Sequence, residues 1–363
     1  MKVKDVINYL DSIAPRQFQE NYDNAGLIVG QSSSTVNGVL VCLDSTEEVV
    51  QEAIDLNCNL IVAHHPIIFS GLKKINGKNY AEKAIIKAIK NDINIFAIHT
   101  NLDNVIDGVN GRIADQLGLV NRKILNPKSN LLVKLVVFCP EDASAQIRDV
   151  LFRCGAGNIG DYSNCSFNAK GEGTFQAKAG ANPYVGNVGE IHKEKEVKVE
   201  VIIPRPNLDS ALKEMISSHP YEEVAYDIYS LENTFNVGSG IIGELESEIN
   251  SIDFLKQVKS KMKAGVVRYT SVCKEKIKKV AVCGGSGSFL LSNAIQQNAD
   301  IFITSDFKYH EFFDANNRLI IADIGHFESE QYTIDLITEG LKKNFSNFAV
   351  RLTGVNTNPI NYL

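Results

Sequence analysis

An internal repeat constrains the fold of this chain more than any other feature of its sequence. Residues 39–65 (VLVCLDSTEEVVQEAIDLNCNLIVAHH) align without gaps with residues 280–306 (VAVCGGSGSFLLSNAIQQNADIFITSD), and seven of the 27 positions are identical. Where identity fails, apolar residues still face apolar residues, as at Leu60 and Ile301. Each copy has the pattern of a strand, a polar turn, a helix and a second strand. The gapless register favours a duplicated half over chance similarity.

Each copy of the repeat continues into a further apolar strand, in residues 93–103 (INIFAIHTNLD) and 318–330 (RLIIADIGHFESE). Continuously apolar strands that alternate with helices are typical of a sheet covered on both faces, in a layered α/β arrangement. We therefore predict one discontinuous, duplicated α/β domain made of residues 1–124 and 244–363.

The intervening residues 125–243 have a different rhythm. Their strand and helix patterns follow the order βα(β)βαβ, which predicts a ferredoxin-like α+β domain inserted between the two halves. A stretch rich in Gly, Asn and Ser at residues 155–189 is too long for an ordinary turn, so we expect a hairpin or a mobile loop there.

Composition excludes several classes of function. The net charge of -6 and pI near 5.7 argue against general binding to nucleic acid or anionic membranes. No apolar run approaches the roughly 20 residues that span a bilayer, and residues 1–15 have the pattern of an amphipathic helix rather than a signal peptide. Seven cysteines without a C-x-x-C pair indicate reduced, mostly buried thiols. We expect a cytoplasmic protein.

Polar side chains gather where the predicted strands end, which is where ligands bind in open α/β sheets. Five of the seven histidines lie at such ends, as do several carboxylates. His326 and Glu330 are spaced to share one face of a helix that begins after Gly325. The strand-end residues of interest are His64, His65, His99, Asp103, Ser305, Asp306, Lys308, His310, Asp323, His326 and Glu330.

Imidazoles and carboxylates together are the ligands of zinc, iron or manganese. The set His64, His65, Asp103, His326 and Glu330 is too small for two closed structural sites and too large for one open site. It suits a dinuclear centre, in which carboxylates bridge ions about 3.5–4 Å apart. A single histidine at a strand end is more often a hydrogen-bonded structural residue, but five ligand-type residues from both copies favour metal. We predict two divalent ions per subunit, zinc first, with iron or manganese as alternatives.

Two further segments contain residues that suit a ligand site. Residues 282–295 (VCGGSGSFLLSNAI) form a glycine-rich turn before a helix, where the amides of Gly285, Ser286, Gly287 and Ser288 could hold a phosphate. The turn matches neither a Walker loop nor a dinucleotide fingerprint, so tight packing is an equal alternative. Asn24 could line a pocket or make a turn before the next strand. His219 with Glu222 and Glu223 could form a second site, although turn chemistry is favoured.

The motifs YDNAGLIVG, AHHPIIF, HTNLD, CGGSGS, TSDFKYH and GHFESE together resemble the signatures of the Nif-three-like proteins, whose bacterial members carry the name GTP cyclohydrolase I type 2 homologue. The insert resembles a PII-like (CutA-like) domain through GAGNIGDYSNCSF and HPYEEVAYDIY. The resemblance implies a dinuclear site at the same five ligands and a ring-shaped homohexamer with the sites facing an inner cavity. It also implies that His99 is a nearby residue that is not a ligand, with Lys308 and His310 as further candidates.

The functional hypothesis is a metal-dependent hydrolase that acts on a small phosphate-bearing substrate such as GTP, opening the guanine ring with release of formate. His99 or His310 would relay protons, and Lys308 with the amides of residues 285–288 would hold the substrate. One alternative is a phosphoesterase or nucleotide hydrolase of the same metal type. Another is a non-enzymatic metal-binding regulatory scaffold whose insert senses a small ligand.

Overall fold

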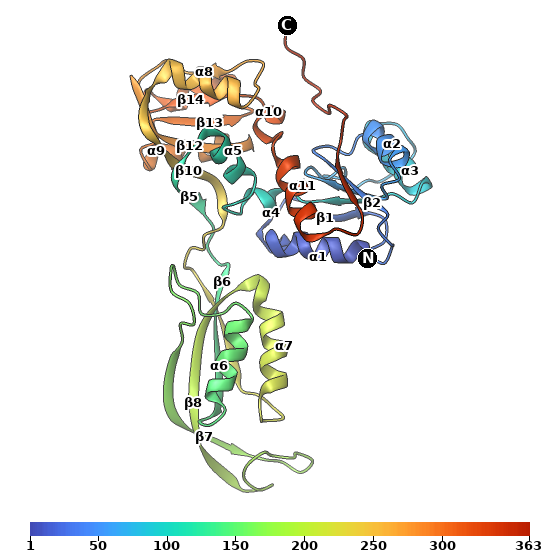
Figure 1. Ribbon diagram of the computed structural model, residues 1–363. Helices are drawn as coiled ribbons and strands as arrows, with labels where there is room; N and C mark the ends of the chain where they lie inside the picture. Colours follow the sequence, from blue (N-terminus) through green and yellow to red (C-terminus); the bar gives the residue numbers. More distant parts are fainter. The chain divides into compact units, whose positions relative to one another are not determined.

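The computed structural model describes residues 1–363 and divides into two compact units (Figure 1). The larger unit comprises residues 1–127 and 236–363, and the smaller comprises residues 128–235. The boundaries expected from sequence, 124/125 and 243/244, fall inside strands β5 (Val120–Pro127) and β10 (Gly238–Asn250) of the larger unit. These strands pair in antiparallel fashion with Gly238 opposite Pro127, so the chain leaves and re-enters the larger unit at adjacent positions.

The first sheet of the larger unit has the order β1-β4-β3-β2-β15. Strands β2, β3, β4 and β15 are parallel, and β1 pairs antiparallel with β4. Helices α2 and α3 share one apolar cluster with the sheet, and α1 contributes to another, so both faces are covered. The bounds are α1 (Val3–Ile13), β1 (Gly26–Val29), β2 (Gly38–Cys42), α2 (Glu47–Asp55), β3 (Leu60–Ala63), α3 (Tyr80–Lys90), β4 (Asn94–Ala97) and β15 (Ala349–Leu352).

The second sheet has the order β11-β14-β13-β12-β10-β5. Strands β12, β13 and β14 are parallel, as β2, β3 and β4 are, and β11 pairs antiparallel with β14 as β1 does with β4. Each copy of the sequence repeat thus forms a pair of parallel strands with a helix between them, α2 in one and α9 in the other. The bounds are β11 (Arg268–Tyr269), β12 (Lys276–Ser286), α9 (Leu291–Gln296), β13 (Ile301–Ser305) and β14 (Ile320–Asp323).

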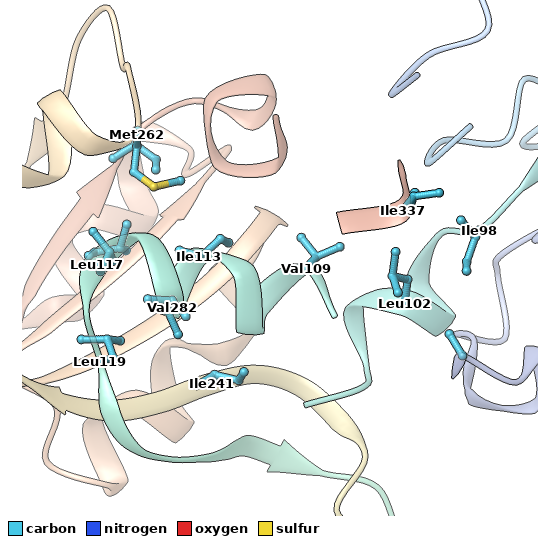
Figure 2. Close-up of a cluster of buried hydrophobic side chains, with 14 of the residues drawn as sticks. Ile98, Leu102, Val109, Ile113, Leu117, Leu119, Ile241, Met262, Val282 and Ile337 are labelled. Atoms are coloured by element: carbon cyan, nitrogen blue, oxygen red, sulfur yellow. The ribbon is translucent and has the colours of Figure 1, made fainter. Parts of the chain in front are cut away.

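One apolar cluster joins the two sheets of the larger unit. Figure 2 shows Leu102 of α4 (Thr100–Asp103) and Ile113 of α5 (Val109–Leu117) in line with Val282 of β12 and Ile337 of α11 (Thr333–Asn344). The same cluster includes Val41 of the first sheet and residues of α8 (Ser251–Lys261). Burial of this continuous apolar surface, at about 25 cal/mol per Å², fixes α4 relative to the second sheet. Asp103, the last residue of α4, is thereby held in place.

The smaller unit contains one antiparallel sheet with the order β7-β8-β6-β9. Helices α6 and α7 pack on it through a separate apolar cluster. The glycine-rich stretch expected to be a hairpin or loop contains β7, which pairs along its length with β8, so it is a hairpin. The bounds are β6 (Leu132–Pro140), α6 (Ser144–Arg153), β7 (Phe167–Gln176), β8 (Ile191–Pro204), α7 (Leu208–Ser218) and β9 (Tyr226–Leu231).

Four 3-10 helices complete the chain, η1 (Arg16–Phe18), η2 (Arg205–Asn207), η3 (Ser288–Leu290) and η4 (Tyr309–Ala315). The mixed α/β class and the amphipathic N-terminal helix are confirmed, since Val3, Val6 and Leu10 of α1 are buried. All seven cysteines are free thiols. None of the helices combines the length and the apolar character needed to cross a membrane.

Candidate metal centre

The five predicted ligands gather at one place in the larger unit. His65, Asp103, His326 and Glu330 line a cavity of about 570 Å³, and the fully buried His64 lies directly behind its wall, near Asp103 and Glu330. His64 and His65 directly follow β3, and Asp103 ends the short helix that follows β4. His326 and Glu330 are the first and last residues of α10 (His326–Glu330), which begins after Gly325 as predicted. The helical spacing places the His326 Nε2 atom 3.2 Å from Glu330 Oε2.

Glu330 lies at the centre of the cluster and is buried. Its Oε2 atom lies 3.0 Å from His65 Nε2 and 3.2 Å from His326 Nε2. Its Oε1 atom lies 3.9 Å from His64 Nε2, which in turn is 3.6 Å from Asp103 Oδ1. The two carboxylate oxygens therefore face two different groups of donors, His65 with His326 on one side and His64 with Asp103 on the other.

The side with His64 and Asp103 leaves two buried polar atoms unsatisfied. His64 Nε2 and Asp103 Oδ1 are both inaccessible to solvent and have no hydrogen-bond partner. Leaving such an atom unpaired costs about 1–3 kcal/mol, so buried polar groups in native proteins almost always have a partner. A divalent cation between them would satisfy both atoms, and the donor set of imidazole and carboxylate fits such an ion.

In each of the three candidate histidine ligands, a hydrogen bond anchors the Nδ1 atom of the ring. His64 Nδ1 hydrogen-bonds the Ile98 carbonyl oxygen at 2.8 Å, His65 Nδ1 the Asp44 carboxylate at 2.8 Å, and His326 Nδ1 the Asp306 carboxylate at 2.6 Å. Such partners fix the orientation of a metal-ligating imidazole and leave Nε2 as the free ligand atom. All three Nε2 atoms point toward Glu330.

The charges of the cluster are strongly coupled. Burial lowers the pKa of His65, but hydrogen bonds to Asp44 and Glu330 outweigh it and raise that pKa to about 10. Burial is likewise outweighed at His326, whose pKa rises to about 11 because of the Glu330 charge and the Asp306 hydrogen bond. The pKa of Glu330 is well below its usual range despite burial, because the imidazoles surround it. Near neutral pH the His65 and His326 imidazoles are therefore protonated, and their charge balances that of Glu330.

Two positions of the glycine-rich turn give Glu330 room. A Cβ on Gly285 would lie 2.4 Å from Glu330 Oε1, and Gly285 has φ +62°, which glycine adopts without strain. A Cβ on Gly284 would lie 2.8 Å from the Val109 side chain. The amide of Gly285 is already used, since it donates to Ser329 Oγ at 2.9 Å. Close packing therefore explains these glycines.

Only some residues of the predicted phosphate site line the cavity. Gly285 and Ser286 line it, whereas Gly287 and Ser288 do not. A Cβ on Gly287 would lie 2.3 Å from Thr304 Oγ1, so this glycine also serves packing. Asn24 lies outside the lining, and its side chain donates to the Ile68 carbonyl at 2.7 Å. In the structure this side chain links the segment before β1 to the loop that follows β3.

His99 lines the cavity, and its ring centre is 5.3 Å from that of His64 and 5.4 Å from that of His65. Its Nδ1 atom is 2.7 Å from Asp23 Oδ1. Burial raises the pKa of Asp23, but hydrogen bonds from His99, Thr100 and Asn24 outweigh burial and lower it to about 2. Asp23 is therefore charged near neutral pH and orients His99 through its Nδ1 atom, which leaves the other ring nitrogen for proton transfer or for a metal ion.

The structure does not bring Lys308 and His310 to the cavity. Both are exposed, and neither lines it, because the chain turns away into η4 after Asp306. The His310 ring contacts those of Tyr309 and Phe313 instead. His219, in the smaller unit, uses both ring nitrogens for structural hydrogen bonds. Its Nδ1 atom accepts from the Tyr221 amide within the same turn, and its Nε2 atom bonds the Phe138 carbonyl of β6, which supports the structural role favoured from sequence.

Several residues that the sequence prediction omits belong to the centre. Asp44 lies two residues after the end of β2 and anchors His65, and the hydroxyl of Thr357 donates to its second oxygen at 2.7 Å. Asn358 then donates to Glu328 in α10 at 3.1 Å, so the C-terminal segment crosses the centre and lines its cavity. Asp44 carries the same signal as the predicted ligands, a carboxylate at the end of a parallel strand. The C-terminal segment carries none.

Exposed aromatic side chains surround the mouth of the cavity. Tyr22, Phe69, Tyr80 and Phe289 all line it, and all four are more than half exposed. The rings of Tyr22 and Phe69 are 6.2 Å apart. No lysine or arginine is among the lining residues. The cavity thus combines an aromatic rim with a floor of histidine and carboxylate side chains.

Comparison with known proteins gives consistent results. A family model described as Duf34/NIF3 (NGG1p interacting factor 3) matches residues 1–359. A Halalkalibacterium halodurans protein named GTP cyclohydrolase 1 type 2 homolog is 38% identical over 364 residues, which cover 99% of this chain and 98% of the relative. A Bacillus subtilis protein of the same name is 36% identical over 367 residues, covering 99% and 98%.

Solved structures agree. The crystal structure of a Bacillus cereus protein related to NIF3 has a TM-score of 0.88 and 36% identity to this chain, covering 100% of it and 99% of that chain. A Staphylococcus aureus protein of known structure has a TM-score of 0.78 and 32% identity, with the same coverage. By the match along its length and by these relatives, the chain belongs to the Duf34/NIF3 family.

Proposed function

We propose that this protein is a dinuclear metal-dependent hydrolase. The observation that carries the proposal is the position of Glu330, whose two oxygens face separate donor groups. One ion would be held by His64, Asp103 and Glu330, and the other by His65, His326 and Glu330. The unsatisfied His64 Nε2 and Asp103 Oδ1 atoms support the first position. Zinc is the preferred metal for both positions, with iron or manganese as alternatives.

When bound, a pair of divalent ions acts as a Lewis acid and supplies hydroxide near neutral pH. The chain contributes the remaining functions. Asp44 and Asp306 hold the His65 and His326 rings in place, so the ligand atoms are preorganised. His99, oriented by Asp23, is the one predicted proton-relay residue that lines the cavity. Lys308 and His310 are not retained in the proposal.

The name shared by the relatives suggests GTP as the substrate. Hydrolysis at C8 of guanine would break both C8–N bonds, consume two water molecules and release the carbon as formate. The aromatic rim supports a substrate with a planar base, since rings such as Tyr22 and Phe289 can stack on it. His99 would donate a proton to the departing nitrogen.

One observation favours a second candidate, the hydrolysis of a phosphoester bond. Because no lysine or arginine lines the cavity, a phosphate entering it would find its positive charge only on the ions. Dinuclear centres suit in-line displacement at a phosphoryl group when that group lies directly between the ions. The base would again stack at the rim, but the bond broken would be a P–O bond.

One experiment separates the two reactions. Zinc- or manganese-loaded protein is incubated with GTP and with a panel of nucleotide phosphodiesters, and formate and free phosphomonoester are measured. Lys308→Ala, outside the cavity, is the control that should keep activity, and His65→Ala should lose it. Formate from GTP supports ring opening, and phosphodiester turnover alone supports the second candidate. If neither product exceeds the His65→Ala background, the hydrolase proposal is wrong and a metal-binding scaffold remains.

We also propose the architecture that the family resemblance implies. The two halves of the larger unit would be a duplication, and the smaller unit an inserted ferredoxin-like (PII/CutA-like) domain, consistent with its strand order β7-β8-β6-β9. The assembly would be a ring-shaped homohexamer in the cytoplasm. Exposed aromatic side chains on η4, with Tyr309 and Phe313 at 73% and 66% exposure, offer surface for such contacts. Light scattering coupled to size exclusion tests this, and a monomer at micromolar concentration would refute it.

A further inference from the structure

The smaller unit contains a cavity of its own, of about 480 Å³, remote in sequence from every residue of the metal centre. Three aromatic rings form part of its wall, Phe175 from β7, Tyr184 from the following loop and Tyr221 from the segment before β9. The ring centre of Tyr221 is 6.5 Å from that of Phe175 and 6.1 Å from that of Tyr184. The volume is that of a small-molecule site.

The charge of the wall is negative. Glu196, Glu222 and Glu223 line the cavity, against a single cationic side chain, Lys178. Other carboxylates of β8 are paired, Glu194 with His192 at 2.9 Å and Glu200 with Lys134 at 3.1 Å. Glu196 has no such ion pair within 4.0 Å. Its charge is therefore available to a ligand.

The backbone leaves space for the Glu196 carboxylate at the wall of the cavity. Gly173, on the neighbouring strand β7, lies against it, and a Cβ at Gly173 would be 2.1 Å from Glu196 Oε2. A Cβ at position 173 would require the carboxylate to move from this place. The loop that carries Tyr184 is also held, because Glu222 accepts a hydrogen bond from the backbone amide of Asn182 at 2.9 Å.

The hydroxyl of Tyr221 provides a further polar atom. It is buried and has no hydrogen-bond partner within ordinary geometry. Burial and the Glu196 carboxylate both raise the pKa of Tyr221, so the phenol stays neutral. The neutral hydroxyl is a donor toward the neighbouring Glu196 carboxylate, while its own oxygen can still accept. The two side chains together therefore offer oxygen acceptors to one ligand group.

We propose that this cavity binds a small organic cation that carries N–H donors, a primary ammonium or a guanidinium group on a short apolar body. The ring faces attract a cation electrostatically, the Glu196 carboxylate pairs with its charge, and the Tyr221 hydroxyl accepts a second N–H. An anionic ligand is disfavoured because three carboxylates face one lysine. The site is independent of the proposed hydrolase function.

The test is isothermal titration of the full chain with n-butylammonium and n-butylguanidinium, with tetramethylammonium as the cation that lacks N–H donors and ATP as the anion. We expect saturable binding of the first two at one site per chain, with weaker binding of tetramethylammonium and none of ATP by the smaller unit. Glu196→Gln should weaken binding by about 10- to 100-fold, the range for a hydrogen bond to a charged group. Tyr221→Phe should weaken it by less.

Two control variants show whether the effect of Glu196→Gln is specific to the cavity. Glu141→Gln, an exposed carboxylate paired with Lys170 elsewhere in the same unit, should bind as the wild type does. His65→Ala should also bind unchanged, because the metal centre plays no part, so failure here and failure of the hydrolase proposal are distinguishable. Circular dichroism confirms that each variant is folded. No saturation with either N–H cation, equal affinity in folded Glu196→Gln, or binding of ATP that Glu196→Gln strengthens would each overturn the proposal.

Discussion

Removing ligands one at a time should change the number of ions bound, because Glu330 divides the centre into two groups. Asp103→Ala removes a ligand of the His64 side, and His326→Ala removes a ligand of the His65 side. Each variant should retain one ion per chain. Glu330→Gln removes the carboxylate whose oxygens face both groups, and it should retain neither.

The gain in melting temperature on metal loading should follow the number of ions that each variant binds. An ion present at 100 times its dissociation constant stabilises the folded state by about 2.7 kcal/mol. For a domain of roughly 150–250 residues, each kcal/mol raises the melting temperature by about 2–4 °C, so one ion should add about 5–10 °C. Wild-type protein should gain about twice that on metal loading, Asp103→Ala about half the wild-type gain, and Glu330→Gln almost none.

The assay is elemental analysis after dialysis against a defined metal buffer, paired with melting curves with and without chelator. Glu141→Gln, in the smaller unit, is the control that should bind two ions and keep the full gain. Loss of both ions in Asp103→Ala together with retention of one in Glu330→Gln would refute the division of ligands around Glu330. A single ion in the wild type would refute the dinuclear centre.

The surroundings of the centre give three more predictions. Gly285→Ala should lose metal because the added Cβ would lie 2.4 Å from Glu330 Oε1. The control is Gly118→Ala, since Gly118 also has a positive φ, +76°, but has open space around it. This control should cost about 1–2 kcal/mol of folding stability and leave the metal content unchanged. Asp44→Asn should weaken the ion held by His65 and His326 by about 10- to 100-fold in a competition titration, with exposed Asp55→Asn as the unaffected control. Metal binding should release protons, because the pKa values of about 10 and 11 at His65 and His326 keep both side chains protonated at neutral pH. The apparent affinity for metal should therefore rise with pH, and the heat of metal titration should differ between buffers of different ionisation enthalpy. Equal heats in such buffers would contradict the assignment.

Much of the larger unit could be predicted from sequence because its signals are local. The repeat carries continuous apolar strands, and the polar residues that end them, such as His64 and Asp103, come together once those strands are parallel neighbours. The i, i+4 spacing of His326 and Glu330 fixes their contact whatever the rest of the fold does. These inferences need only periodicity and the direction of the strands.

The rest depends on contacts between distant segments, which periodicity does not encode. Nothing in the sequence around Thr357 indicates that its hydroxyl reaches Asp44. Lys308 and His310 share the strand-end signal with the ligands, yet the turn after Asp306 takes them away from the cavity. The glycines at 284 and 285 resemble a phosphate-binding turn, but the constraint on them is the volume of Glu330. The compact units divide at 127/128 and 235/236, because β5 and β10 pair with each other and so belong to the larger unit along their length.

The pairing of Gly238 with Pro127 has a practical consequence for protein engineering. Two antiparallel strands whose ends lie opposite each other can be closed by a tight hairpin of as few as about two residues. Residues 128–235 could therefore be replaced by a short Asn-Gly linker without moving any strand of the larger unit. Such a shortened chain would show whether metal binding and any hydrolysis require the smaller unit.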